Sequence, residues 1–136
     1  YEILIGLVGS EMCIRDSKYG VSTEADLVFD VRCLPNPYYI KELRSQTGCD
    51  SSVRDYVMSF EQSRILLDKI KDLLDFLIPL YVHEGKSQLV ICFGCTGGKH
   101  RSITFTELVS DYLIKRGLRV QKSHRDIGKD ISYYRT

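Results

Sequence analysis

The sequence lacks any apolar run long enough to span a membrane, so no transmembrane helix is expected. It has almost no excess of charge of one sign: the net charge is +1, and any basic surface must therefore come from local clustering. Internal repeats and low-complexity tracts are absent. The five cysteines are odd in number and lack the spacing of a small disulfide scaffold, which favours free thiols in a reducing, cytoplasmic compartment.

The size of the chain fits one domain. Its 136 residues, 43% hydrophobic and 27% charged, have an ordinary globular composition. The beginning differs from the rest, because GSEMCIRDS within residues 1–17 resembles translated sequencing-adapter sequence. That segment has neither the basic region nor the cleavage site of a signal peptide. We expect residues 1–17 to be a non-native leader and residues 18–136 to be the functional domain.

The apolar pattern alternates between strands and helices. Residues 25–32, 88–95 and 118–123 are short apolar runs typical of buried strands. Apolar residues recur at helical spacing from residue 53 onward, in one helix or two abutting ones that we expect to end near Pro79. A second stripe covers residues 105–113, and Gly117 is a suitable stop for it. The order β-α-β-α-β predicts an α/β layered domain with a largely parallel sheet.

The segment GCTGGKHRS, residues 94–102, joins the strongest predicted strand to a helix. Backbone N–H groups at a helix N-terminus lack intrahelical partners, and the helix dipole adds positive charge there. Glycines let such a loop curl around a ligand, and its basic residues favour an anion, above all a phosphate. The alternative is an ordinary tight turn with incidental basic residues. The candidate ligand-binding residues are Cys95, Thr96, Gly97, Gly98, Lys99, His100, Arg101 and Ser102.

Three sharper interpretations compete for this segment. A Walker A loop needs four residues between its glycines and Ser or Thr after the lysine, and neither condition is met. A cysteine phosphatase has the pattern C-x5-R-[ST], which Cys95 and Arg101 satisfy, although Gly94 stands where those enzymes usually have His. A zinc or redox pair of Cys92 and Cys95 lacks a second ligand pair. The phosphatase, with Cys95 and Arg101 as catalytic residues, is the alternative function.

Two further groups of residues are candidates. Arg32 ends the first strand and Asn36 lies on a rigid proline-flanked loop, so both are expected at the edge of the sheet where α/β proteins bind ligands. Their plain alternatives are a surface salt bridge and a turn asparagine. A basic cluster near the C-terminus suits RNA phosphates, the alternative being a solvated terminal strand. Its members are Arg119, Lys122, His124, Arg125 and Lys129.

Several ordered motifs resemble the C-terminal domain of the RapZ/YvcJ family. They are KYG at 18–20, DVR at 30–32, LPNP at 34–37, TG at 47–48 with Asp50, and GCTGGKHRS at 94–102. The resemblance covers residues 18 to about 130. It implies a ligand-sensing α/β domain in which Cys95, Thr96, Gly97, His100 and Arg101 surround a hexosamine phosphate, glucosamine-6-phosphate in the best-known members.

The resemblance also implies a regulatory role. The family's domain binds a small regulatory RNA and presents it to an endoribonuclease, so we expect an RNase adapter rather than an enzyme, with no metal or cofactor. Members normally carry an N-terminal P-loop domain that this sequence does not show. The nucleotide binding of those members is therefore not expected of this chain. Tyr38 stands where some members have a His near the sugar. The identity of the sugar and of the RNA, and whether the chain forms a homo-oligomer, stay open.

Overall fold

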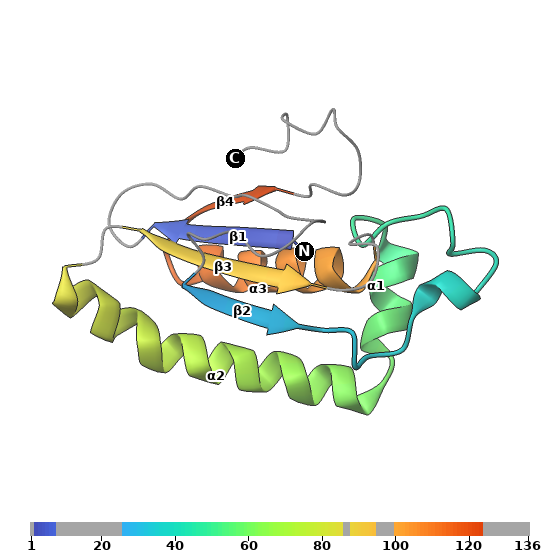
Figure 1. The fold of residues 1–136 in the computed structure, drawn as a ribbon, viewed down its shortest axis with the longest axis horizontal. Helices are drawn as coiled ribbons and strands as arrows, with labels where there is room; N and C mark the ends of the chain where they lie inside the picture. The colour runs from blue at the N-terminus through green and yellow to red at the C-terminus, as the bar shows by residue number, and fades with distance from the viewer. Residues whose placement is uncertain (1, 8–25, 86–87, 95–99, 124–136) are drawn as a thin grey trace.

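A computed structural model describes residues 2–7, 26–85, 88–94 and 100–123. Its four strands are β1 (Glu2–Leu7), β2 (Leu27–Asp30), β3 (Leu89–Gly94) and β4 (Arg119–Ser123). They form one sheet in the order β2-β3-β1-β4, as Figure 1 shows. The helical elements are a short 3-10 turn η1 (Pro37–Tyr39) and the helices α1 (Ser51–Met58), α2 (Glu61–Glu84) and α3 (Arg101–Lys115).

The strand directions confirm the predicted α/β layered class. β2 pairs with β3 in parallel, with Leu27 opposite Ile91 and Asp30 opposite Gly94. β1 pairs antiparallel with both β3 and β4. Consequently β2, β3 and β4, the three strands expected from the apolar pattern, all run in the same direction. The structure also contains β1, which the predicted order of strands and helices did not include. It runs in the opposite direction, between β3 and β4.

The predicted long helical stretch consists of two helices, and the expected end at Pro79 is wrong. α2 continues through Pro79 and stops at Gly85, whose positive φ of 88° closes the helix. A proline inside a helix removes a single backbone hydrogen bond, here the one to the carbonyl of Asp75. The helix tolerates that loss because Pro79 lies on its exposed side. Its opposite side is anchored in the core through Ser63, Leu67, Ile70 and Leu74.

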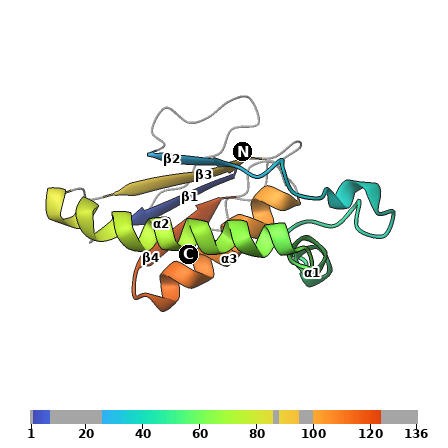
Figure 2. The same cartoon turned by 90° about the horizontal axis from the view of Figure 1, so that it is seen from below.

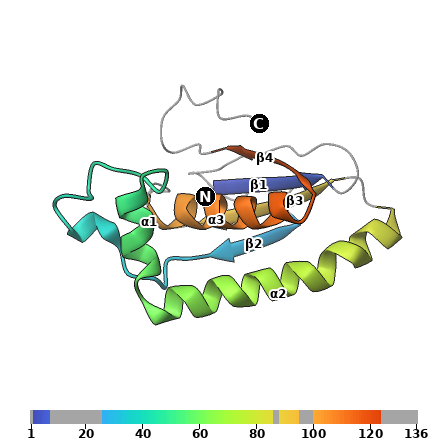
Figure 3. The same cartoon turned by 180° about the vertical axis from the view of Figure 1, so that it is seen from behind.

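The helices and the sheet form two layers. α2 and α3 lie on the same side of the sheet, which the view from below shows (Figure 2). From behind, α3 crosses in front of the strands (Figure 3). The layer between them is apolar: Phe93 of β3 and Phe105 of α3 have ring centroids 6.3 Å apart, and Phe29 of β2 stacks on Phe93 at 5.5 Å. Every residue of β3 is buried, as its continuous apolar run predicts.

Candidate functional site

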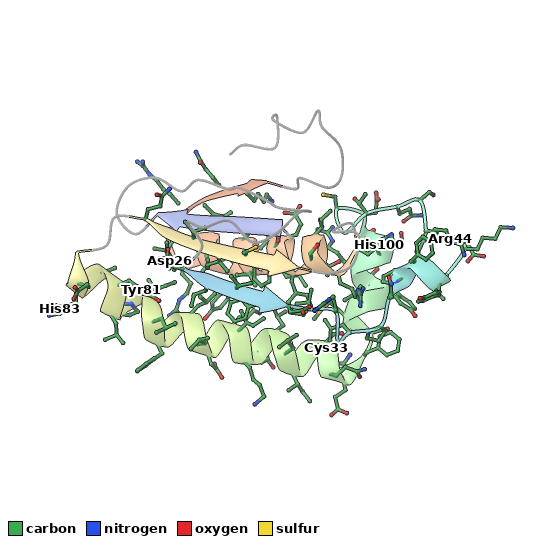
Figure 4. The ribbon with its side chains drawn as sticks, in the orientation of Figure 1. Asp26, Cys33, Arg44, Tyr81, His83 and His100 are labelled. Carbon is green, nitrogen blue, oxygen red and sulfur yellow. The ribbon has the colours of Figure 1, made fainter. Side chains whose placement is uncertain are left out.

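The carboxyl ends of β2 and β3 and the N-terminus of α3 meet at one end of the sheet (Figure 1). The pairing of β2 with β3 continues one residue beyond the strand, because the Val31 amide donates to the Gly94 carbonyl at 2.8 Å. His100, which precedes α3, lies at this end, and Arg44 lies on the adjoining loop (Figure 4). Tyr81 and His83 lie at the opposite end of the molecule (Figure 4). The start of α3 thus lies at the sheet edge where the sequence predicts a ligand site, and ligand binding there stays a prediction.

The N-terminus of α3 begins with a histidine at the cap position. His100 occupies the cap position, and its side chain makes no cap hydrogen bond. The first backbone bond of the helix runs from the Thr104 amide to the His100 carbonyl at 3.0 Å. The amides of residues 101–103 precede this first helical bond, so none of them has a partner within the backbone ladder of α3. Helix N-termini favour anions, because their amides and the helix dipole both attract negative charge.

Arg101 connects this helix to the loop that follows β2. Its NH1 donates to the backbone carbonyls of Arg32 and Leu34 at 2.7 and 2.9 Å. The side chain is only 4% exposed. In the described ranges, no hydrogen-bond acceptor lies within reach of its buried Nε. Arg101 therefore holds the Arg32–Leu34 segment against the start of α3 through acceptors that are themselves neutral.

Gly48 brings a third segment to the same helix turn. A Cβ at this position would lie 2.4 Å from the Thr104 amide nitrogen and 2.7 Å from the His100 carbonyl oxygen. Both neighbours are backbone atoms, so they cannot move aside as a flexible side chain could. The loop itself is closed by Asp50, whose carboxylate accepts from the Thr47 amide at 2.9 Å. Only glycine permits this approach of the loop to the first turn of α3.

Asp30 and Arg32 form an ion pair at the end of β2. The Arg32 guanidinium contacts both carboxylate oxygens of Asp30, at 2.6 to 3.0 Å, and the Arg32 amide donates to Oδ1 at 2.9 Å. The Arg32 side chain is 61% exposed and the Asp30 side chain is 41% exposed. The hydrogen bond from the Arg32 side chain is the main cause that lowers the pKa of Asp30, and the charge of Arg101 adds to it. Asp30 is therefore an ionised acceptor at neutral pH.

The proline-flanked loop uses its asparagine locally. The Asn36 side chain accepts from the Tyr38 amide at 3.0 Å and caps η1. Beyond it, the ring of Tyr38 is exposed, with the Arg44 guanidinium 4.9 Å from its centroid. The Arg44 Nε also donates to the Tyr38 carbonyl at 2.9 Å. Asn36 thus makes the local hydrogen bond of a turn asparagine, and its role in ligand binding stays a prediction. The exposed Tyr38 ring lies beside it.

The predicted loop residues divide into two groups. His100 and Ser102 are buried at the start of α3, at 5% and 0% exposure. Five residues of the predicted loop lie outside the described residues, and their roles stay predictions. They are Cys95, Thr96, Gly97, Gly98 and Lys99.

The predicted RNA-binding cluster is divided in the same way. Arg119 is exposed at the start of β4. Lys122 instead forms an ion pair with Glu107 of α3 at 2.5 Å, with side chains 17% and 13% exposed. The positions of His124, Arg125 and Lys129 lie outside the described residues. The sequence did not indicate the Glu107 partner, because the pairing depends on how β4 packs over α3.

Other chemistries find little support among the residues with defined placement. In these ranges, no group of three His, Cys, Asp or Glu side chains could hold a metal ion. Cys92 is fully buried in β3, as expected for a small apolar residue in a strand. Within the same ranges, no helix is both long enough and apolar enough to cross a membrane.

Comparison with known proteins identifies the family. The family described as RapZ C-terminal domain matches residues 16–128. A nucleotide-binding protein of Acetivibrio thermocellus is 58% identical over 113 residues, which are 83% of this chain and 39% of the relative. One from Clostridium novyi is 53% identical over 114 residues, 84% of this chain and again 39% of the relative. The chain thus spans about two fifths of the length of these relatives, and it belongs to the RapZ C-terminal domain family.

Proposed function

We propose that this domain is a regulatory sensor that binds a hexosamine phosphate, such as glucosamine-6-phosphate, at the N-terminus of α3. The observation that carries the proposal is a buried arginine at the start of α3, which two neutral backbone carbonyls orient and whose Nε makes no hydrogen bond to the described residues. Helix amides, helix dipole and guanidinium all favour a phosphate at this place. Membership in the family supports the same ligand class.

The residues around the helix start suggest a division of roles. The Arg101 NH1 donates to two backbone carbonyls and its Nε makes no hydrogen bond within the described ranges, so in this proposal the remaining donors of the guanidinium contact the phosphate. Lys99 and the glycines before it complete the cradle in this proposal. Tyr38 and Arg44 lie on the adjoining loop, where the exposed ring offers a surface for the sugar.

The second half of the proposed function is RNA binding. The domain presents a small regulatory RNA to an endoribonuclease through the basic C-terminal segment. Support comes from the family and from the exposed Arg119 on β4. Because bound RNA releases counterions, its affinity should fall steeply with salt. Replacing Arg119, Arg125 and Lys129 together by Ala should flatten that dependence, and an unchanged slope would place the RNA surface elsewhere.

A non-enzymatic role agrees better with the chemistry of the site than phosphatase activity does. A cysteine phosphatase needs a general acid for its leaving group. Asp30 is a carboxylate at this end of the sheet, but Arg32 lowers its pKa, which makes it a poor proton donor near neutral pH. Asp50 accepts a hydrogen bond from the Thr47 amide and so braces its own loop.

Calorimetric titration tests the sensor function. The protein should bind glucosamine-6-phosphate and should not bind glucosamine, which lacks the phosphate. Lys99→Ala should weaken binding about tenfold, since a hydrogen bond to a charged group contributes about 1.5–3 kcal/mol. Lys115→Ala is the matched control, because Lys115 lies in the last turn of the same helix and should leave affinity unchanged. Equal binding of both sugars would refute the proposal, as would aryl phosphate turnover that Cys95→Ser abolishes.

A further inference from the structure

The turn η1 presents two neighbouring tyrosine rings to solvent. Tyr38 is 51% exposed and Tyr39 is 77% exposed, although a tyrosine ring usually buries most of its apolar surface. The ring centroids lie 5.9 Å apart, and the rings are nearly perpendicular, at 86°. Among the described residues, no large hydrophobic side chain is more exposed than Tyr39. Adjacent exposed rings form an apolar patch, which is typical of an interaction site.

The backbone beneath the two rings is held in place by its own contacts. Pro37, at the start of η1, is buried, and the Asn36 side chain accepts from the Tyr38 amide at 3.0 Å. The Ile40 amide closes the turn on the Pro37 carbonyl at 2.9 Å. From the other side, the Arg44 Nε donates to the Tyr38 carbonyl at 2.9 Å. The rings therefore project from a preorganised turn, which reduces the entropy lost when they bind a partner.

The charge around the rings favours an anionic partner. The Arg44 guanidinium lies 4.9 Å from the centroid of the Tyr38 ring, in a cation–π contact. Lys41 is exposed on the same segment. In the sequence of residues 36–46, Glu42 is the only acidic residue beside these two cations. Arg44 also lies at the same end of the molecule as the start of α3, where helix amides favour a phosphate (Figure 4).

Flat rings beside cations match the chemistry of single-stranded RNA. Its unpaired bases stack on aromatic rings and on guanidinium planes, and nearby lysines and arginines contact its phosphates. In a duplex, the bases are stacked on one another, so their faces are not accessible to a ring. A protein partner uses both features only where apolar and acidic groups are combined on its surface, whereas every nucleotide carries a flat base and a phosphate.

We propose that Tyr39, supported by Tyr38 and Arg44, is a stacking platform for an unpaired base of single-stranded RNA, with Lys41 and Arg44 on the adjoining phosphates. The inference rests on the RNA half of the proposed function. It gives that function a second contact surface, on η1, in addition to the basic C-terminal segment. It also defines the kind of RNA, which has accessible base faces at this place and little constraint on sequence, because every base has a face that can stack.

A tryptophan at position 39 reports the stacking directly. The sequence contains no tryptophan, so Tyr39→Trp introduces a unique indole into the full chain. A short single-stranded oligouridylate should quench its emission, whereas inorganic polyphosphate, which has the charge but no bases, should not. Phe76→Trp is the matched control, because Phe76 is 67% exposed on α2, away from η1, and its emission should not change. Quenching at neither position, or equal quenching at both, would overturn the platform.

Affinity measurements separate the ring from the charge. Tyr39→Ala should weaken oligouridylate binding about tenfold, as expected when one stacked base is lost. Its salt dependence should stay that of the parent, because the ring carries no charge. Lys41→Ala should instead reduce the salt slope by about one released counterion. Tyr39→Phe should keep the affinity and Tyr39→Leu should not, since leucine is apolar but has no flat face.

The RNA function and the platform fail in different ways. If the parent chain does not bind oligouridylate, both are wrong. If it binds with a steep salt dependence and Tyr39→Ala binds equally well, only the platform is wrong. If Tyr39→Leu binds as tightly as Tyr39→Phe, the rings do not stack on bases, and the patch fits a protein partner instead.

Discussion

Two basic side chains that the sequence assigns to ligand surfaces, Arg101 and Lys122, both have partners inside the protein, but of different kinds. Arg101 donates to the carbonyls of Arg32 and Leu34, which are neutral. Lys122 pairs with the carboxylate of Glu107. Carbonyl acceptors orient a guanidinium without cancelling its charge, whereas a carboxylate neutralises its lysine. Positive potential is therefore kept at the start of α3 and largely cancelled between α3 and β4.

Arg101→Ala should have the largest effect. It removes two charge-assisted hydrogen bonds that each contribute about 1.5–3 kcal/mol, so the free energy of unfolding should fall by about 3 kcal/mol or more. The Arg32–Leu34 loop loses its anchor, and affinity for glucosamine-6-phosphate should fall at least tenfold. Urea unfolding and calorimetry measure the two losses separately.

Arg101→Lys separates charge from geometry. A lysine restores the positive charge but cannot reproduce the fixed fork of donors that holds two carbonyls. Partial recovery of phosphate affinity with poor recovery of stability is expected. Full recovery of both would show that charge alone matters at this position. Arg116→Ala, at the far end of α3 where Arg116 pairs with Asp75, should leave phosphate affinity unchanged.

Lys122→Met should cause the next largest loss of stability, and it should do so through a different mechanism. It leaves the Glu107 carboxylate mostly buried without its lysine, which typically costs about 3 kcal/mol of stability. Replacing both residues, as Lys122→Met with Glu107→Leu, should recover most of that loss, since a well-packed apolar pair avoids the desolvation of two charges. Denaturant unfolding checks both variants. Phosphate affinity should stay at the parent value, and a drop comparable to that of Arg101→Ala would remove the contrast between the two regions.

Gly48→Ala should cost about 2 kcal/mol, as expected for an added methyl group in a tightly packed place. The methyl group would overlap the backbone of Thr104 and His100, so the loop must move away from the first turn of α3. Thermal unfolding measures the cost, and phosphate titration shows whether the site depends on this contact. Gly85→Ala serves as a comparison, because Gly85 has a positive φ but nothing within 4 Å of an added Cβ. Equal phosphate affinity in Gly48→Ala and the parent would show that phosphate binding does not depend on this loop.

The sequence predicted the layers well, because they follow from local signals. The continuous apolar run of β3 and the glycine-rich segment after it indicate a buried strand that leads into a helix N-terminus. The partners of Arg101 and Lys122 could not be predicted from the sequence. The Arg32 carbonyl that Arg101 contacts is 69 residues away in the chain. The pairing of Lys122 with Glu107 depends on how β4 packs over α3. The contact of Gly48 with α3 was hidden for the same reason: a glycine signals permitted conformations, not its neighbours.

The smallest effect concerns Asp30, and it tests directly whether the charge of Arg101 is felt. The hydrogen bond from Arg32 lowers the pKa of Asp30 first, and the Arg101 charge lowers it further. A carboxyl whose folded pKa is depressed stabilises the protein above its unfolded pKa, near 3.9, and this contribution disappears as the pH falls through the folded pKa. Because the pair is exposed to solvent, the contribution should stay below about 1 kcal/mol. Asp30→Asn should thus be slightly less stable than the parent at pH 7, and the difference should disappear as the pH falls through the folded pKa of Asp30. NMR titration of the Asp30 carboxyl should give a higher pKa in Arg101→Ala than in the parent and an unchanged pKa in Lys122→Met. If both variants leave it unchanged, the potential at the start of α3 does not come from Arg101.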